Sequence, residues 1–339
     1  MLAPEPVKAD TRKVVLSGIQ PTGKMHIGNY VGAVSLWVQN QTRYDNLFCI
    51  ANMHALTIPE AINPKTLRQQ SRETAALLLA CGIDPQQSIV FMQSDVAAHA
   101  YLAWILSCCT PVGWLERMTQ YKTKAAKTEV VSSGLLTYPV LQTADILAYK
   151  AAYVPVGDDQ KQHLELARDV AERFNHLYEA YFPLPDVLTR TSGTRIMGMD
   201  DPSAKMSKST AQTRSGHAIG VLDTLDVIRK TIMSAVTDTG NETRFEVASA
   251  GVRNLLTLYE VLSGETRDQI ETRFAGRGYG ALKRELVELV VRTLEPIQAR
   301  FREISDAPEY LNDVLAQGAE CARERAERTL ADVRQLVGL

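Results

Sequence analysis

The sequence predicts an α/β fold built on a doubly wound parallel sheet, followed by an all-helical C-terminal part. Short apolar, β-branched runs at 14–16, 47–50 and 89–92 alternate with helical periodicity as far as residue 109, and such alternation is typical of parallel βαβ units. From about residue 216 onward no strand-like run is left. At 339 residues, the chain is long enough for about two domains.

The composition limits what the protein can be. Apolar residues make up 45% of the chain, charged residues 22%, and the net charge is −2, so an RNA partner would need local basic patches rather than a global basic field. Residues 1–12 lack an apolar signal core and are expected to form a loose leader. The most apolar stretch, 97–109, is too short to cross a bilayer. We therefore expect a cytoplasmic protein without a membrane partner.

Three common kinds of site are disfavoured. The five cysteines are odd in number and form no C-x-x-C pair, which argues against a disulfide framework or a zinc ribbon. No H-E-x-x-H string is present, so a zincin-type metalloprotease is disfavoured. Residues 18–24 approach the spacing of a Walker loop, but Met25 stands where a magnesium-binding Ser or Thr is needed.

The turn after the first strand is the stretch around which the chain is organised. Turn residues at 20–23 end the strand, and helical spacing begins at His26. This arrangement directs unpaired N–H groups and the positive end of a helix at one point, which favours an anion. Gly28 lacks a Cβ, so a flat or bulky ligand can lie against the first helical turn. Without further signals, an ordinary βα turn is the commoner explanation.

The next elements follow in order. Asn63 and Pro64 supply the cap and first-turn proline of a helix that runs to Gly82, and another helix is expected at about 97–109. Between 111 and 134 the alternation lapses. Basic residues gather there, and a solvated helix face explains them as well as a binding role does: Arg117, Lys122, Lys124 and Lys127.

An aspartate stands in an apolar helix expected over 135–149, with Pro139 in its first turn. Tyr138, Gln142 and Asp145 share one face of that helix because of their spacing. A carboxylate between apolar neighbours needs a partner. That partner is either a lysine or arginine in a structural ion pair or a donor on a bound ligand.

Two more strands are expected, at 153–156 and 195–197. Asp158 or Asp159 can cap the helix that follows the first of them. In the helical part, the glycines at 276–280 follow no strand, so they predict a helix–helix turn rather than a phosphate site. Gly318 lies on the apolar side of the last helix and marks either a close packing contact or a weak point.

Four separated stretches resemble the class I aminoacyl-tRNA synthetases, and within them the bacterial tryptophanyl-tRNA synthetases. Residues 21–29 are similar to the first signature of that class, with Asn29 in its last position, and Lys205-Met206-Ser207-Lys208-Ser209 is similar to the second. Residues 135–149 and 153–163 resemble the parts that hold tryptophan and both substrates. Two lysines on a mobile polar segment can close on the β and γ phosphates and stabilise the charge that grows on pyrophosphate.

The resemblance runs from about Lys13 to the C-terminus and implies a domain plan. A Rossmann-like catalytic domain is expected at 13–210, with an insertion at about 97–150 that forms a homodimer contact and a signature loop at 202–209. A helical domain that binds the tRNA anticodon is expected at 211–339, and its last helix could pack back on the catalytic domain. The implied partners are L-tryptophan, tRNA(Trp) and a second copy of the chain, with ATP as substrate and Mg²⁺ held by its phosphates.

The resemblance also implies which residues serve each ligand. The implied catalytic set is Lys205, Lys208, Lys124, His26 and Gln20. The implied ATP-binding set is Gln20, Pro21, Thr22, Gly28, Asn29, Gly157, Asp158, Asp159, Ile196, Lys205, Met206, Ser207, Lys208 and Ser209. The implied tryptophan-binding set is Leu16, His54, Tyr138, Gln142, Asp145, Val154, Val156 and Gln160.

In the implied reaction, the tryptophan carboxylate attacks the α-phosphorus of ATP, and the acyl group then passes to the 3′ end of the tRNA. Asp145 would accept a hydrogen bond from the indole N–H, and a ligand without that donor would leave Asp145 unpaired and be strongly rejected. Two positions depart from the family pattern, because Gln142 stands where methionine is expected in many members and Leu16 where phenylalanine is expected.

Three alternatives stay open on the sequence. A tyrosyl-tRNA synthetase has the same architecture, but Asn29 and the helix around Asp145 argue against it. A catalytically silent regulator that binds nucleotide or RNA would not need Lys205, Lys208 and Asp145. A nucleotidyltransferase with the same first signature would have no use for the long helical part.

Overall fold

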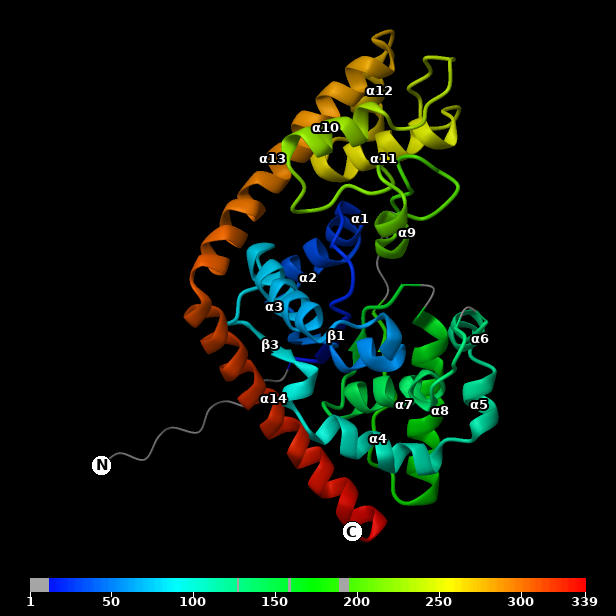
Figure 1. The fold of residues 1–339 in the computed structure, drawn as a ribbon, viewed down its shortest axis with the longest axis vertical. Coiled ribbons are helices and arrows are strands. Elements are labelled where there is room, and N and C mark those ends of the chain that lie inside the picture. The colour runs from blue at the N-terminus through cyan, green and yellow to red at the C-terminus, as the bar shows by residue number, and fades with distance from the viewer. Residues whose placement is uncertain (1–11, 127, 158–159, 189–194) are drawn as a thin grey trace, which may run out of the picture.

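The computed structural model describes residues 12–339 except 127, 158–159 and 189–194, without the side chains of Ser209 and Gln212 (Figure 1). The expected leader at 1–12 and two predicted ATP-site residues, Asp158 and Asp159, therefore lie wholly or almost wholly outside the described residues. The described part contains a five-stranded parallel sheet in the order β3-β2-β1-β4-β5. Its strands are β1 (Val14–Ile19), β2 (Asp45–Ile50), β3 (Ser88–Met92), β4 (Tyr153–Val154) and β5 (Asp186–Val187).

Strand order explains where a ligand can bind. The chain leaves central β1 first towards β2 and β3, and later returns to the other side as β4 and β5. This reversal between β1 and β4 leaves a crevice at the carboxyl ends of the strands, which is the usual ligand position in such sheets. The sheet is buried on both faces, because Phe48 and Ile50 of β2 contribute to one apolar core and Leu47 and Cys49 to the other.

Helices cover the two faces. α3 (Pro64–Ala80) packs in the core that contains Phe48, and α4 (Ala98–Cys109), α7 (Ser133–Leu147) and α8 (Lys161–Leu177) pack in the core that contains Leu47. Asn63 caps α3 by accepting from the N–H groups of Lys65 and Thr66, as predicted. Short 3₁₀ segments, Met53–Thr57, Pro59–Ala61 and Gln93–Asp95, follow β2 and β3.

The helix after β1 is not a regular α-helix. It begins as α1 (Ile27–Asn29), widens into a π-helical turn at Tyr30–Val34 and ends as α2 (Ser35–Gln39). The predicted helical spacing from His26 is thus confirmed in extent, while the period changes inside it. Such π-helical turns are often found at functional sites.

The insertion is helical, and the expected position of Pro139 in its last helix is wrong. α5 (Val112–Glu116) and α6 (Thr119–Ala125) fill the region where no alternation was visible. α7 begins at Ser133 and is capped by Ser132, whose hydroxyl accepts from the N–H of Leu135. Pro139 therefore lies inside the helix and not in its first turn, because the Ser132 cap starts the helix earlier than the proline alone suggested.

The last predicted strand is wrong. Residues 195–197 form no strand; Met197 makes only an isolated antiparallel bridge to Lys205. The fifth strand is instead β5, which pairs with β4 through two residues, Asp186 and Val187. α9 (Lys208–Thr213) begins inside the segment predicted as a loop at 202–209, because the Ser207 hydroxyl caps it by accepting from Thr210 N–H.

Among the described residues from 225 onward, the regular elements are helices, separated by turns and by an irregular stretch at 234–249. These helices are α10 (Leu225–Met233), α11 (Ala250–Ser263), α12 (Arg267–Phe274), α13 (Gly278–Asp306) and α14 (Pro308–Val337). Gly276 and Gly278 have positive φ angles between α12 and α13, so the predicted helix–helix turn is confirmed. The apolar core of these helices is continuous with the sheet face that contains Phe48.

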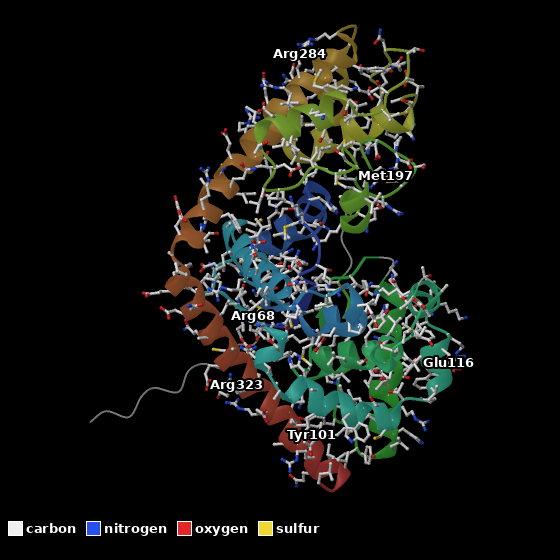
Figure 2. All side chains as sticks on the ribbon, viewed as in Figure 1. Arg68, Tyr101, Glu116, Met197, Arg284 and Arg323 are labelled. Carbon is white, nitrogen blue, oxygen red and sulfur yellow. The ribbon has the colours of Figure 1, made fainter. Side chains whose placement is uncertain are left out.

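Helix α14 runs back along the part that contains the sheet and packs on edge strand β3 (Figures 1 and 2). A Cβ at Gly318 would lie 1.9 Å from the carbonyl oxygen of Val90, so Gly318 is a close packing contact rather than a weak point. Arg325 of α14 also donates to Asp45 at the start of β2 at 2.6 Å. None of the described helices is both long enough and apolar enough to span a membrane.

Candidate active site

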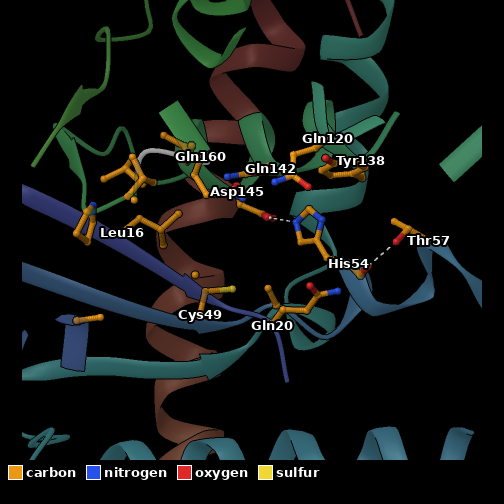
Figure 3. A pocket seen from close by; sticks show the side chains of 18 of the residues that line it. Leu16, Gln20, Cys49, His54, Thr57, Gln120, Tyr138, Gln142, Asp145 and Gln160 are labelled. Atoms are coloured by element: carbon orange, nitrogen blue, oxygen red, sulfur yellow. Dashed lines mark hydrogen bonds and ion pairs between the residues drawn. The ribbon is translucent and has the colours of Figure 1, made fainter. Parts of the chain in front are cut away.

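A cavity of about 360 Å³ opens at the carboxyl ends of β1 and β2, beside β4 (Figure 3). All eight residues that were expected to hold the amino acid line it: Leu16, His54, Tyr138, Gln142, Asp145, Val154, Val156 and Gln160. β1 and β4 supply apolar walls, and α7 supplies the polar face that its spacing predicted. The structure thus brings this set together, and its role in binding tryptophan stays a prediction.

Asp145 is buried at one side of this cavity and is surrounded by donors. His54 Nε2 lies 2.8 Å from Oδ2, and His99 Nδ1 lies 2.6 Å from Oδ1. Gln93 Nε2 donates to Oδ1 at 2.8 Å and to Oδ2 at 2.9 Å. Burial alone would raise the pKa of Asp145, but hydrogen bonds from His54 and His99 lower that pKa well below its usual range.

The expected alternatives for the Asp145 partner did not include these groups. The structural partners are two histidines and a glutamine, not a lysine or an arginine. Sequence reasoning missed Gln93 and His99, although a histidine inside the apolar stretch 97–109 was a usable signal for a buried polar contact. Gln93 directly follows β3 and gave no signal of its own.

A second layer fixes the orientation of His99. The Tyr149 hydroxyl lies 2.6 Å from His99 Nε2, and both rings pack against Phe91. Because the ionised Asp145 only accepts, His99 Nδ1 donates to it, and His99 Nε2 shares a hydrogen bond with the Tyr149 hydroxyl. Burial raises the pKa of Tyr149 further above its ordinary value, so this hydroxyl stays protonated.

A groove of about 610 Å³ adjoins the first cavity and shares Gln20, Gln120, Lys124 and Gln160 with it. It is also lined by Thr22 and Asn29 from the segment after β1 and by Lys208 from α9. Lys208 Nζ lies 3.4 Å from the carbonyl oxygen of Gln20. The two signature segments therefore meet at one groove, which is the arrangement that a shared triphosphate would need.

Both lysines of this groove are partly desolvated. Burial lowers the pKa of Lys208 to about 8 and also lowers the pKa of Lys124, whose ammonium lies 5.0 Å from the centre of the Tyr138 ring. Cations that water solvates poorly gain more from an anionic ligand than fully hydrated ones do. Gln120, which was not predicted, lines both cavities beside Lys124.

His26 has a structural task in this site. Its Nδ1 accepts from the N–H of Asn29 at 3.2 Å, and the Asn29 side chain accepts from the His26 N–H, which forms a reciprocal cap of the helix. Burial and the nearby lysines 208 and 205 lower the pKa of His26 to about 3, so the ring is neutral. A Cβ at Gly28 would lie 3.1 Å from this ring, so the glycine keeps the capped turn compact.

The second signature, residues 205–209, was expected to bind ATP, but several of its residues line neither cavity. Lys205 is exposed and lines neither cavity, Met206 is buried in the core, and the Met206 N–H donates to the carbonyl of Ile196 at 3.1 Å. Pro21, Gly28 and Ser207 also line neither cavity, whereas Gly157 lines the first. In this conformation the bond between Met206 and Ile196 holds the signature segment, and Lys208 is the lysine of that segment that lines the groove.

The family match follows from comparison with known proteins. The model of the class I tRNA synthetases (W and Y) matches residues 8–295. The chain belongs to this family. The predicted family membership and Rossmann-like fold are therefore confirmed.

Relatives in this family are similar over almost their whole length. The tryptophan–tRNA ligase of Wolinella succinogenes is 48% identical over 97% of this chain and 99% of that protein. The tryptophan–tRNA ligase of Listeria monocytogenes (strain EGD-e) is 48% identical over 97% of this chain and 98% of that protein.

Solved structures of the family have the same fold. The crystal structure of tryptophanyl-tRNA synthetase from Mycoplasma pneumoniae matches with a TM-score of 0.88 at 35% identity, over 97% of this chain and 98% of that one. The Campylobacter jejuni enzyme, complexed with ADP and tryptophan, matches with a TM-score of 0.84 at 36% identity, over 96% of this chain and 100% of that one. A tyrosyl-tRNA synthetase from Aeropyrum pernix, at 20% identity, has a similar fold.

The sequence resemblance implied that Mg²⁺ is held by the phosphates of ATP and not by protein side chains. Among the described residues, no group of three or more His, Cys, Asp or Glu side chains could hold a metal ion. The groove instead presents cationic groups, Lys124 and Lys208, where a phosphate chain would lie. These side chains suit an anion that carries its own divalent cation.

Proposed function

We propose that this chain is a tryptophan–tRNA ligase, which activates L-tryptophan with ATP to tryptophanyl-adenylate and pyrophosphate and then transfers tryptophan to the 3′ end of tRNA(Trp). The observation that carries the proposal is the continuity of two cavities. An apolar cavity with a buried carboxylate, Asp145, opens into a groove with Lys124 and Lys208. The names of the relatives and family membership support the same activity.

The shared lining places the reacting groups. If the indole of tryptophan lies towards Asp145, the carboxylate of tryptophan lies towards Gln20, Lys124 and Gln160, which line both cavities. ATP in the groove would bring its α-phosphorus to the same junction. Alignment of the carboxylate with the phosphorus needs no covalent nucleophile from the protein.

Charge stabilisation would complete the activation step. Lys208 and Lys124 would face the phosphates, where positive charge is most useful as the Pα–O bond breaks. Mg²⁺ would arrive with ATP and neutralise phosphate charge. Lys205 would reach the phosphates only if its segment moves, whereas His26 and Asn29 act by holding the helix start in place.

The deciding experiment is ATP–pyrophosphate exchange with tryptophan, tyrosine and ring-substituted tryptophans. We expect exchange with tryptophan and none with tyrosine. Exchange with tyrosine alone would favour a tyrosyl-tRNA synthetase, and no exchange with any amino acid would favour a silent regulator. The substituted tryptophans measure how Gln142 and Leu16 set the width of the cavity.

The helical part is the proposed tRNA-binding region, with residues 13–210 left for catalysis and 211–339 for the anticodon. A polar groove of about 580 Å³ between α11, α12 and α13 is lined by four arginines, namely Arg273, Arg277, Arg284 and Arg292. Ion pairs with Glu265 and Glu285 hold two of them in place. We expect Arg284→Glu to lower aminoacylation of tRNA and to leave pyrophosphate exchange unchanged, because Arg284 stands on α13 in the helical part (Figure 2) and lines neither cavity.

A homodimer is proposed through the insertion. Tyr101, Trp104 and Val112 leave large apolar surfaces exposed on α4 and α5, and residue Trp104 is 70% exposed. Apolar surface of this kind is typical of a subunit contact. Analytical ultracentrifugation should find a dimer for the wild type and a monomer for Trp104→Glu; a monomeric wild type at working concentration would contradict the proposal.

A further inference from the structure

Asp145 has no spare acceptor site in this structure. Each of its two oxygens lies within hydrogen-bond distance of two donor nitrogens: His99 Nδ1 is at Oδ1, His54 Nε2 is at Oδ2, and Gln93 Nε2 is shared between both. An ionised carboxylate offers about four lone-pair positions. A ligand N–H that is to bond Asp145 must therefore replace a protein donor.

Two of the three donors are fixed away from the cavity. The His99 side chain is fully buried, and Tyr149 occupies its other ring nitrogen at 2.6 Å. Gln93 is fully buried, and its Oε1 accepts from the Met53 N–H at 3.0 Å. Neither side chain lines the cavity, so displacing either one would break a second buried contact as well.

The third donor, His54, is placed to leave. It lines the cavity, its side chain is 13% exposed, and it stands on the short 3₁₀ segment Met53–Thr57 rather than on a strand or α-helix. Its ring has an edge contact with Tyr138 at 6.2 Å between centres. Figure 3 shows the His54 ring in contact with Asp145 among the side chains that line the cavity.

We propose that His54 is a specificity-determining residue whose N–H occupies the hydrogen-bond position of the indole N–H on Asp145 Oδ2 until tryptophan binds. The indole N–H replaces the His54 N–H on Oδ2, while His99 and Gln93 keep their bonds. This inference rests on the proposed function, since it takes the indole of tryptophan as the ligand. It adds that the empty site already holds a substitute donor for Asp145.

The consequence reverses the strong rejection predicted from the sequence. A tryptophan analogue without the indole N–H leaves His54 on Asp145, so the carboxylate is not left unpaired. Rejection of such an analogue is then weaker than for a buried carboxylate without a substitute partner. Without a donor at position 54, the same analogue would leave Oδ2 short of one hydrogen bond, and rejection would become stronger.

The test compares equilibrium binding of L-tryptophan and of 3-(benzothiophen-3-yl)-L-alanine, whose sulfur replaces the N–H. The quantity compared is the dissociation constant of the analogue divided by that of tryptophan. In His54→Phe, which keeps a ring but no donor, we expect this ratio to rise about tenfold over the wild type. His54→Gln retains a donor near the Nε2 position and should keep the wild-type ratio. His54→Ala, which also lacks the donor, serves as a second variant if His54→Phe does not fold.

Each outcome separates the two proposals. A purely structural role for His54 would weaken both ligands alike and leave the ratio unchanged, which would overturn the inference. A ratio that falls in His54→Phe would overturn it too. If wild-type protein binds no tryptophan and catalyses no tryptophan-dependent exchange, the proposed function itself fails.

Discussion

The two adjoining cavities differ in how their polar groups are held. Around Asp145, every described hydrogen bond is short, lies within or beside the core, and joins side chains from four different segments. In the groove, Lys208 makes one long contact of 3.4 Å to Gln20 and stands at the first residue of a six-residue helix. The polar groups around Asp145 thus have protein partners at short distances, whereas among the described residues the Lys208 ammonium has only one long contact and can still pair with an anion.

Under the proposed function, this difference places selection and catalysis in different kinds of structure. A buried carboxylate held by His99 and Gln93 distinguishes ligands by small changes in hydrogen bonding at its remaining contact. A half-buried lysine on a short helix gains most when an anion enters, and that gain is largest where charge develops during reaction. The comparison predicts that variants of the two regions fail in separate assays.

The largest expected effect comes from the groove. Lys208→Ala should lower tryptophan-dependent pyrophosphate exchange by roughly 100-fold to 1000-fold, because it removes a cation aimed at the leaving phosphates. Tryptophan affinity, measured by equilibrium binding, should not change. Lys230→Ala, an exposed lysine of α10, is the matched control; an equal loss there would show that total charge matters rather than position.

The next effect comes from the network. Asp145→Ala should lower the free energy of unfolding by about 3 kcal/mol, because it leaves buried donors without an acceptor, and should also abolish measurable tryptophan binding. Urea denaturation and binding measured on the same sample check both parts, and ATP binding is the control. Unchanged stability would mean that Asp145 is needed for the ligand alone.

The acidity of Asp145 gives the sign of a related pH effect on stability. Its folded pKa lies below its unfolded value, so its contribution is present above the ordinary aspartate pKa and is lost as the pH falls towards the folded value. Asp145→Ala should therefore lose less stability, relative to wild type, in strongly acidic buffer.

The smallest expected effect is a pH dependence of kcat/KM for ATP that comes from Lys208 in the groove. Since the pKa of Lys208 is about 8 in the free protein, its positive charge is present below pH 8 and is lost above it. We expect kcat/KM for ATP in the exchange reaction to fall as the pH rises through about 8. Lys208→Arg should move that fall to higher pH, because a guanidinium keeps its proton; an unmoved fall would assign the titration to another group.

The sequence predicts the two regions unequally well. The first three strands have clear apolar runs, and the spacing on α7 correctly places Tyr138, Gln142 and Asp145 on the cavity side. The donors to Asp145 lie 46 to 91 residues away, and local periodicity carries no information about such distant pairings. β5 was missed because two residues, one of them charged, give no strand signal.

The groove was harder to predict for a different reason. Its signature residues are recognisable as a string, but the string does not say which side chains face the ligand. Met206 is apolar and enters the core, and Lys205, which pairs with Met197 in an isolated bridge, lines neither cavity. Tertiary packing, not the local sequence, decides that Lys208 lines the groove.

Helix α14 ties the far end of the molecule to the amino-acid cavity. Gly318 rests on the Val90 carbonyl of edge strand β3, and the chain continues from β3 directly into Gln93 beside Asp145. A 30-residue helix is a rod about 45 Å long. A shift of this rod at Gly318 would push on the strand three residues before Gln93, so mechanical strain from the helical part would arrive first at the donor side of the Asp145 carboxylate.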